Sequence, residues 1–394
     1  MKNDQISWWL ILLINLNVMI GAGIFVYPSM IASYGKSLGF LSFALVFLIM
    51  IPLVFTVAQI SLLFPAQEGG LYVYSKQSFG KKIGLFSAVI YFVAKAISCS
   101  IMIRTFVNYL ITISPTVAHI PGWFMRLLVL LVLVVLNFFG IKQGARLQLG
   151  FSFLKIGTII IVIIGGFLIF NKANLSLLPA SFGLLTLSLP LAMYPMMGFE
   201  TCCAIAHTIA QPRKMAQVIL YSFFIVTGLY MFFQFFLFGA LGSSLIGTKA
   251  PLSLFFETLF KGYAGQLLTI LGVSAVMTSA LGAAYGILFT NSWYAYVIGK
   301  ESGLPSQERT NGIPIYAVLF QGILIAVLVV LPIQLALLGV LAVFGVLISY
   351  LFTALSMIYL YTKKEKEIAL PRWVALLSVA SCIIMMFLCL KNIF

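Results

Sequence analysis

The sequence of 394 residues is 62% hydrophobic and only 8% charged. Soluble domains carry charge on about a quarter of their residues, so this chain lacks the polar groups needed to cover a water-exposed surface. Its apolar segments have the length of membrane-spanning helices, about 20 residues, rather than that of the ~10-residue alternating strands of an outer-membrane barrel. The composition therefore excludes a soluble protein and predicts an all-α integral membrane protein whose surface contacts the lipid bilayer.

The net charge of +15 would also fit a nucleic-acid-binding protein. No basic stretch, however, is long enough to form a nucleic-acid footprint. An excess of lysine and arginine in cytoplasmic loops, with few acidic residues, is common in inner-membrane proteins. We therefore expect no nucleic-acid partner and a multi-pass location in the cytoplasmic (inner) membrane.

The sequence lacks the patterns of a metal site, a disulfide framework or an enzyme. All five cysteines lie in apolar segments without metal-ligand spacing, which indicates small buried hydrophobic residues. There is no Walker loop, no H-E-x-x-H motif and no Ser-His-Asp set. We expect no cofactor, no metal and no enzymatic activity, and the missing nucleotide motifs disfavour an ATP-driven pump.

Eleven apolar segments predict eleven membrane-spanning helices. They cover residues 6–33, 39–64, 83–113, 123–140, 149–170, 183–209, 215–241, 264–298, 313–331, 335–361 and 373–391. The first continues past residue 30 without a cleavage site, which indicates a retained span rather than a signal peptide. The eighth predicts either one long tilted helix or a separate surface helix over 252–261. No loop is long enough for a soluble domain, so residues 1–394 form a single transmembrane domain.

Basic residues are divided unequally between the two sets of alternating loops. Fourteen share the side of the N-terminus: Lys2, Lys76, Lys81, Lys82, Lys142, Arg146, Arg213, Lys214, Lys300, Arg309, Lys363, Lys364, Lys366 and Arg372. Six lie on the opposite side: Lys36, Arg126, Lys172, Lys249, Lys261 and Lys391. Because cytoplasmic loops carry the excess of lysine and arginine, the N-terminus is predicted in the cytoplasm and the C-terminus outside.

The first and sixth spans both contain helix-breaking residues. The first carries Gly21–Ala22–Gly23 in mid-span, with Pro28 following, and the sixth carries Pro190, Pro195 and Gly198. A break in hydrocarbon frees backbone N–H and C=O groups, which is tolerated where the break lines a cavity. A packing glycine or a proline kink would explain either segment alone. Two breaks five spans apart instead predict a midplane binding site.

The paired breaks divide the chain into two halves of five spans, 6–170 and 183–361, with 373–391 as an extra C-terminal helix. Because five is odd, the halves enter the membrane from opposite sides, as in the inverted repeats of secondary transporters. Unpaired N–H groups after Gly23 suit a carboxylate. Unpaired carbonyls near Met196 and Met197 suit an ammonium group. Together these sockets predict a zwitterionic ligand, of which a free amino acid is the simplest.

Four motifs resemble those of the amino acid–polyamine–organocation (APC) superfamily, including bacterial amino-acid permeases and the arginine/agmatine antiporter. They are IGAGIF at 20–25, FPAQEGGLYVYSKQSFGKKIG at 64–84, GFETCCAIAHTIAQPRK at 198–214 and GKESGLPSQERTNGIPIYAVL at 299–319. The resemblance implies a LeuT-like 5+5 inverted-repeat fold with broken helices 1 and 6 over about residues 6–361. It also implies a homodimer, although the eleven spans depart from the twelve of many relatives.

The resemblance assigns roles to individual residues. The substrate carboxylate would bind backbone N–H groups of a short run: Gly21, Ala22, Gly23 and Ile24. The amino group would face backbone carbonyls of the sixth span: Met196, Met197 and Gly198. Tyr194 stands at the position of a gating aromatic, and Glu200 matches a glutamate that couples binding to gating. Cys99 falls where the antiporter has a polar side-chain contact, and the change to cysteine argues for a different substrate.

Charged residues inside membrane spans are functional candidates. Lys155 stands where sodium-coupled relatives of this fold bind a sodium ion, and its ammonium could replace that cation and carry a proton; the alternative is a lysine that snorkels to the membrane surface. Lys95 lies one turn before Cys99 and would repel cationic substrates, unless it pairs with Glu200. Arg104 is interpreted as a snorkelling or gate residue, and His207 as a helix-end cap.

These features predict a secondary active amino-acid transporter that works by alternating access without sodium, through proton symport or amino-acid exchange. A neutral or acidic amino acid is the favoured substrate because of Lys95. The alternatives are a cationic amino-acid or polyamine antiporter and, from another class, a membrane nutrient sensor that does not transport. A passive channel is disfavoured by the paired breaks.

Overall fold

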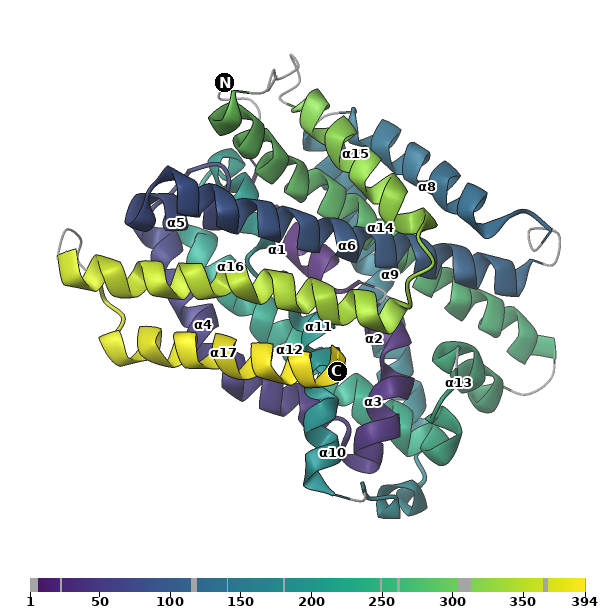
Figure 1. Ribbon diagram of the computed structural model, residues 1–394. Helices are drawn as coiled ribbons and strands as arrows, with labels where there is room; N and C mark the ends of the chain where they lie inside the picture. The colour runs from purple at the N-terminus through teal and green to yellow at the C-terminus, as the bar shows by residue number, and fades with distance from the viewer. Residues whose placement is uncertain are drawn as a thin grey trace.

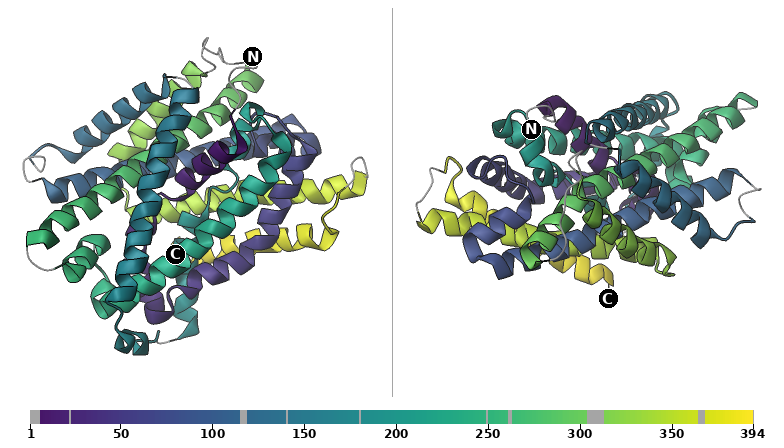
Figure 2. Two further views of the ribbon diagram at one scale, coloured as in Figure 1. Left: turned by 180° about the vertical axis from the view of Figure 1, so that it is seen from behind. Right: turned by 90° about the horizontal axis from the view of Figure 1, so that it is seen from above.

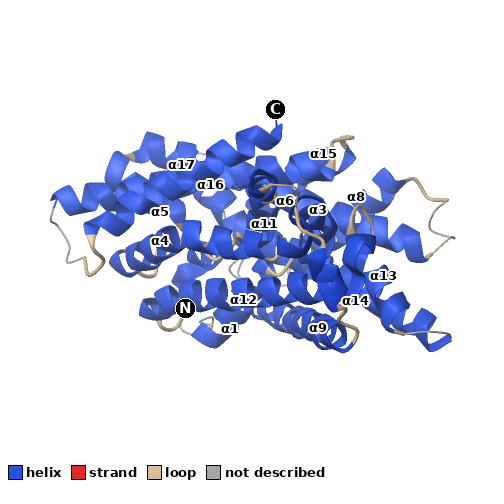
Figure 3. Cartoon of the chain, turned by 90° about the horizontal axis from the view of Figure 1, so that it is seen from below, coloured by secondary structure: helices blue, strands red, loops and turns tan. Residues whose placement is uncertain are grey.

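The computed structural model describes residues 6–21, 23–114, 119–139, 141–179, 181–248, 250–260, 263–303, 313–363 and 368–393. Within these ranges the chain is helical and has no β-strand (Figure 3). Nine described helical stretches are long and apolar enough to cross a membrane, and two shorter apolar helices bring the number to the predicted eleven. The prediction of an all-α membrane protein is confirmed.

The helices of the first half are α1 (Trp8–Met19), α2 (Gly23–Val26), α3 (Pro28–Gly35), α4 (Leu41–Leu63), α5 (Leu71–Phe79), α6 (Lys81–Ile113), α8 (Gly122–Asn137) and α9 (Ile141–Leu168). Those of the second half are α10 (Phe182–Leu187), α11 (Leu189–Met196), α12 (Met215–Leu241), α13 (Pro251–Leu259), α14 (Tyr263–Ser302), α15 (Ile315–Val330), α16 (Leu335–Lys363) and α17 (Arg372–Ile393). Short 3₁₀ helices are η2 (Lys36–Leu38), η3 (Lys172–Ser176), η4 (Thr201–Thr208), η5 (Pro212–Lys214) and η6 (Gly242–Leu245).

The long helix α6 organises the bundle. It packs against α14 on one side and α16 on the other. The first span lies in the middle of the bundle, as Figure 1 and the left panel of Figure 2 show. In Figure 1, α16 and α17 form one edge, whereas α8 and α15 lie together near the opposite edge. This arrangement buries the broken first span and leaves α8 and α15 at the periphery.

The first span is interrupted at its glycine segment. Helix α1 ends at Met19, and α2 begins at Gly23, which confirms the predicted break in the glycine segment. Tyr27, between α2 and α3, keeps helical φ and ψ angles, and its N–H donates to the Gly23 carbonyl at 2.9 Å. Pro28 is the first residue of α3, a position at which its missing N–H costs no helical hydrogen bond. The proline therefore begins a helix rather than breaking one.

The sixth span breaks after its prolines rather than at them. Pro190 lies in the first turn of α11 and Pro195 near its end, and the helix continues to Met196. Gly198 has a φ of +110°, a conformation that favours glycine. The chain then resumes as the 3₁₀ helix η4 instead of the α-helix that the apolar run suggested.

The eighth span follows one of its two predicted forms. Helix α13 is a separate short helix over Pro251–Leu259, and α14 begins only at Tyr263. The predicted surface helix is therefore present. The division into repeats at 6–170 and 183–361 and the membrane orientation of the termini stay predictions.

Candidate functional site

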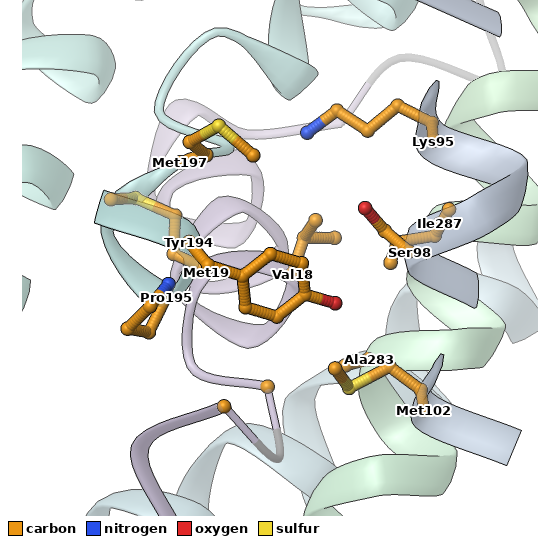
Figure 4. A pocket seen from close by; sticks show the side chains of 12 residues that line it. Val18, Met19, Lys95, Ser98, Met102, Tyr194, Pro195, Met197, Ala283 and Ile287 are labelled. Carbon is orange, nitrogen blue, oxygen red and sulfur yellow. The ribbon is translucent and has the colours of Figure 1, made fainter. Parts of the chain in front are cut away.

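A small cavity lies where the two broken spans meet (Figure 4). Its walls come from both breaks and from α6 and α14: Val18, Met19, Gly21, Gly23, Lys95, Ser98, Met102, Tyr194, Pro195, Met197, Ala283 and Ile287. Its volume is about 30 Å³. Because a cavity needs about 10–15 Å³ to hold one water molecule, an amino acid requires this site to widen.

The two breaks approach each other closely at Gly23. A Cβ atom on Gly23 would lie 3.2 Å from the Pro195 Cβ and 3.2 Å from the Tyr194 Cδ1. Only a residue without a side chain permits this approach. The Tyr194 ring extends across the cavity toward the side of α6 that carries Ser98 and Met102 (Figure 4). Tyr194 thus covers the first-span break.

Some of the predicted site residues line the cavity, and others do not. Lining residues among them are Gly21, Gly23, Lys95, Tyr194 and Met197. Residues not among the lining are Ile24, Cys99, Lys155, Met196, Gly198 and Glu200. Ala22 lies outside the described residues.

Cys99 does not supply the expected cavity contact. Its side chain is fully buried, and its Sγ donates toward the Ala284 carbonyl at 3.6 Å. The preceding residue, Ser98, lines the cavity instead, together with Met102 one turn further along α6. The prediction was therefore wrong by one position along α6, because Ser98 rather than Cys99 faces the cavity.

Glu200 is the centre of a buried polar cluster next to the cavity. Its Oε1 accepts a hydrogen bond from the Tyr91 hydroxyl at 2.6 Å and lies 3.1 Å from the Lys95 ammonium. Its Oε2 accepts from the Tyr350 hydroxyl and from the Gly198 N–H. Of the two alternatives for Lys95, repulsion of cationic substrates or pairing with Glu200, the structure shows the ion pair. Lys95 also lines the cavity.

The backbone freed at the sixth-span break is bound by Asn15, a buried residue of α1. Its Nδ2 donates to the Phe199 carbonyl at 3.0 Å and to the Ser222 hydroxyl at 2.7 Å. Its Oδ1 accepts from the Cys202 N–H at 3.2 Å. One side chain thus joins the inner part of the first span to the kink of the sixth and to α12.

The carbonyls freed at the end of α1 are bound by side chains of three other helices. Lys155 of α9 donates to the Asn17 carbonyl at 2.7 Å. Tyr230 donates to the Met19 carbonyl at 3.1 Å, and Ser279 donates to the Ile20 carbonyl at 3.4 Å. Lys155 has no exposed surface, so it does not snorkel but connects α9 to the broken span.

Arg104 does not snorkel, whereas His207 lies in the last turn of a helix, as expected for a helix-end residue. Arg104 is buried and donates hydrogen bonds to carbonyls at the end of α15, including those of Leu328 and Ile333 at 2.6 Å each. It satisfies a helix terminus rather than snorkelling. His207 lies in η4 beside the Trp293 ring and lines a cavity.

Two larger cavities flank the central one. One has a volume of about 750 Å³ and is lined by Val26, Ser29, Met30, Thr105, Asn108, Tyr109, Ile111, Gly247, Thr248, Ala250 and Leu335. The other has a volume of about 360 Å³ and is lined by Ala66, Gln67, Glu68, Tyr72, Val73, Lys76, Gln77, His207, Val297, Lys300 and Glu301. By the predicted orientation, the first lies on the outer side and the second on the cytoplasmic side. We call them the outer and inner cavities.

Tyr91, Tyr350 and Asn15 were not identified from the sequence. Their partners lie far along the chain: Tyr91 and Glu200 are separated by 109 residues, and Asn15 and Phe199 by 184. The chain holds 17 tyrosines, so residue type alone did not mark these two. For Asn15, a polar amide inside an apolar span was an available signal.

The comparison with known families agrees with this geometry. A family model described as amino acid permease matches residues 6–392, which is nearly the whole chain. That match includes both broken spans, the cavity between them and the helices that bind their freed carbonyls. The chain belongs to this amino acid permease family of the APC superfamily, and membership implies amino acid transport.

Proposed function

We propose that the protein is a secondary active transporter that carries a neutral or acidic amino acid through the central cavity by alternating access. The observation that carries this proposal is the position of the small closed cavity between two breaks, with larger cavities on either side. Transport would open the central cavity to one large cavity at a time. The membrane would be the cytoplasmic one, with the N-terminus inside, and a homodimer is compatible with this function.

The two ends of the substrate would use backbone groups at the breaks. The carboxylate would bind N–H groups of the segment from Gly21 to Ile24, in which Gly23 lines the cavity, whereas the Gly21 N–H donates to the Met19 carbonyl at 2.8 Å and would have to be released. The amino group would bind the Met197 carbonyl, because Met197 lines the cavity whereas the Gly198 carbonyl already accepts from the Thr201 N–H at 3.0 Å. Met196 would support this turn from behind the wall.

The charge of the wall favours a neutral or acidic side chain. Lys95 lines the cavity and Glu200 does not, so the substrate would meet the ammonium before the carboxylate. Lys95 is paired with Glu200 at 3.1 Å, so neither charge is free for the substrate, and no carboxylate among the described residues lines the cavity to balance a cationic side chain. This supports a neutral or acidic amino acid over arginine or a polyamine.

The binding of the freed α1 carbonyls supports transport without sodium. Sodium would need free carbonyl oxygens, yet those of Asn17, Met19 and Ile20 already accept hydrogen bonds from side chains. Lys155 is a titratable group at this position, so a proton would be the coupling ion if the protein is a symporter. Amino-acid exchange would need no such ion.

A thermal-stability screen of the purified protein in detergent tests this function. The ligands are the twenty amino acids, agmatine and putrescine, each with and without sodium, because a ligand that binds the folded state raises the melting temperature. We expect stabilisation by a neutral or acidic amino acid, independent of sodium, and uptake of that amino acid by proteoliposomes. Gly23→Val should abolish both the stabilisation and the uptake, because the valine side chain would keep the two broken spans from approaching each other.

Three results would contradict the proposal. Stabilisation only by arginine, agmatine or putrescine would indicate a cationic antiporter. Binding without uptake would indicate a sensor. Normal uptake by Gly23→Val would place the substrate away from the two breaks.

A further inference from the structure

An apolar groove runs between α8 and α15 at the periphery of the bundle (Figure 1). Its volume is about 240 Å³, and its lining residues are Leu127, Leu130, Leu131, Val134, Leu319, Gly322, Ile323 and Ala326. Leu131 and Ile323 are 59% and 68% exposed, so the groove faces away from the bundle. In a membrane-spanning protein, this face meets lipid hydrocarbon.

One end of the groove is closed by a bridge between the two helices. Arg126, next to Leu127 in α8, donates from its guanidinium to the Val329 carbonyl of α15 at 3.1 Å. Val329 lies one turn beyond Ala326. At the opposite end, a Cβ on Gly322 would lie 3.2 Å from Val134. The helices are therefore antiparallel, and Arg126 lies at the predicted outer end of the groove.

A second arginine converges on the same helix end. Arg104 donates to the carbonyls of Leu328, Leu331 and Ile333. Together with the bond from Arg126 to Val329, these contacts satisfy the last carbonyls of α15. The Nε atoms of both arginines are buried and donate no hydrogen bond within the described part of the chain. Both guanidiniums therefore retain donor capacity.

The positive charge of this pair is not balanced by a carboxylate. No salt bridge among the described residues includes Arg104 or Arg126. The C-terminus of α15 supplies only about half a negative charge. A buried guanidinium, that of Arg104, and a half-buried one, that of Arg126, are costly without an anionic partner. The site therefore has the electrostatic properties of an anion-binding site that adjoins a hydrocarbon groove.

We propose that this surface binds an anionic phospholipid, with the phosphate at the half-buried Arg126, the buried Arg104 adding positive charge behind it, and one acyl chain in the α8–α15 groove. Guanidinium groups bind phosphate oxygens through paired hydrogen bonds. Trp123 and Phe124, which precede Arg126, are 52% and 49% exposed, as expected for aromatic residues at the membrane–water interface. The headgroup, the interface and the acyl chain thus each have a matching part of the surface.

Melting of the purified protein in detergent, titrated with phosphatidylglycerol or with zwitterionic phosphatidylcholine, tests the proposal. We expect tighter apparent binding of phosphatidylglycerol. Arg126→Gln removes the charge together with the hydrogen bond to the Val329 carbonyl, and should weaken phosphatidylglycerol binding about fivefold, because one basic residue near an anionic membrane contributes about 1 kcal/mol. Lys391→Gln, at the same predicted membrane face, should have no effect.

A second pair of variants tests the acyl chain. Ala326→Phe fills the groove, whereas Val327→Phe places the same ring on the neighbouring lipid-facing position outside it. We expect only Ala326→Phe to weaken phosphatidylglycerol binding. Equal binding of the two lipids by the wild type, or unchanged binding by Arg126→Gln, would overturn the proposal. Equal stabilisation by inorganic phosphate would do so too, because it would identify an anion site without a lipid.

Discussion

Asn15 joins the two broken spans through its side-chain amide. Asn15→Ala would leave the Phe199 carbonyl and the Cys202 N–H without their partner. Each unpaired buried group costs about 1–3 kcal/mol. We expect the kink to loosen, so that the KM for the transported amino acid rises and the melting temperature falls. Proteoliposome uptake and thermal melting of the variant measure the two effects.

A matched control lies two residues along the same helix. Asn17 is equally buried, but its side chain donates to the Gly282 carbonyl of α14 at 2.9 Å rather than to the kink. Asn17→Ala should lower the melting temperature with a smaller effect on KM. If the two variants changed KM equally, Asn15 would have only the general role of a buried amide.

The sequence predicted the backbone residues of the site better than its side chains. Gly21 and Gly23 are recognisable because glycine weakens a helix wherever it occurs. Ser98 was missed in favour of Cys99, because a one-residue error in phase rotates a helix by about 100°. The partners of Glu200 come from α6 and α16, and no local pattern specifies such distant contacts.

At the scale of elements, Lys155 is the only lysine whose ammonium connects α9 to the broken first span among the described residues. Lys155→Met keeps the length of the side chain and removes the donor, which leaves the Asn17 carbonyl unpaired. We expect transport to be lost, or to lose its dependence on pH, while the protein still inserts in the membrane. Uptake measured from pH 5 to 8 checks this.

Ser152→Ala is the control for this variant, since Ser152 also joins α9 to α1, through a hydrogen bond to the Leu13 carbonyl at 2.9 Å. It should keep the wild-type pH profile. Wild-type uptake by Lys155→Met at every pH would show that the ammonium has only a structural role.

The end of α14 that is predicted to face the cytoplasm is connected to α5 and α6 by ion pairs. Glu301 lies 2.5 Å from the Lys76 ammonium and 3.5 Å from that of Lys81. The hydrogen bond to Glu301 raises the pKa of Lys76, so this lysine stays charged through the physiological range. Exposed pairs contribute only about 0–1 kcal/mol to stability, so their effect should concern the position of α14 rather than the folded state.

Glu301→Gln tests this connection. We expect the inner cavity to open more often, and so a faster reaction of a cysteine placed at Val73, which lines that cavity, with a maleimide. The melting temperature should change little. Glu68→Gln, which removes only the pair with Lys300 at 3.3 Å, should have a smaller effect. An unchanged labelling rate in Glu301→Gln would contradict a role for these pairs in closure.

The composition predicted that the membrane-spanning helices exist. The positions of the prolines alone did not predict where the first and sixth spans break. Pro28 and Pro190 lie in the first turns of α3 and α11, where a missing N–H is tolerated, whereas Pro195 lies inside α11 near its C-terminal end. The sixth-span break falls at Gly198 because its positive φ is accessible to glycine. The 3₁₀ form of η4 depends on contacts that no local pattern carries, among them the hydrogen bond from the Cys202 N–H to Asn15.

At the scale of the whole molecule, the proposed function places the central, outer and inner cavities on one path with its narrowest point at the two breaks. The central cavity of about 30 Å³ lies between an outer cavity of about 750 Å³ and an inner one of about 360 Å³. This form of the protein is closed around the site. An amino acid enters only if Tyr194 and the breaks move apart, so binding and conformational change are necessarily coupled.

Alternating access makes a reciprocal prediction for the two large cavities. Thr105 lines the outer cavity and Val73 the inner one, and both are buried in the closed form. In a chain whose five native cysteines are replaced, Thr105→Cys and Val73→Cys report the opening of each side through their maleimide reaction rates. Conditions that speed one reaction should slow the other, because one population of molecules is divided between two open forms. If the transported amino acid speeds both reactions together, the path opens at both ends at once, and the protein works as a channel rather than a transporter.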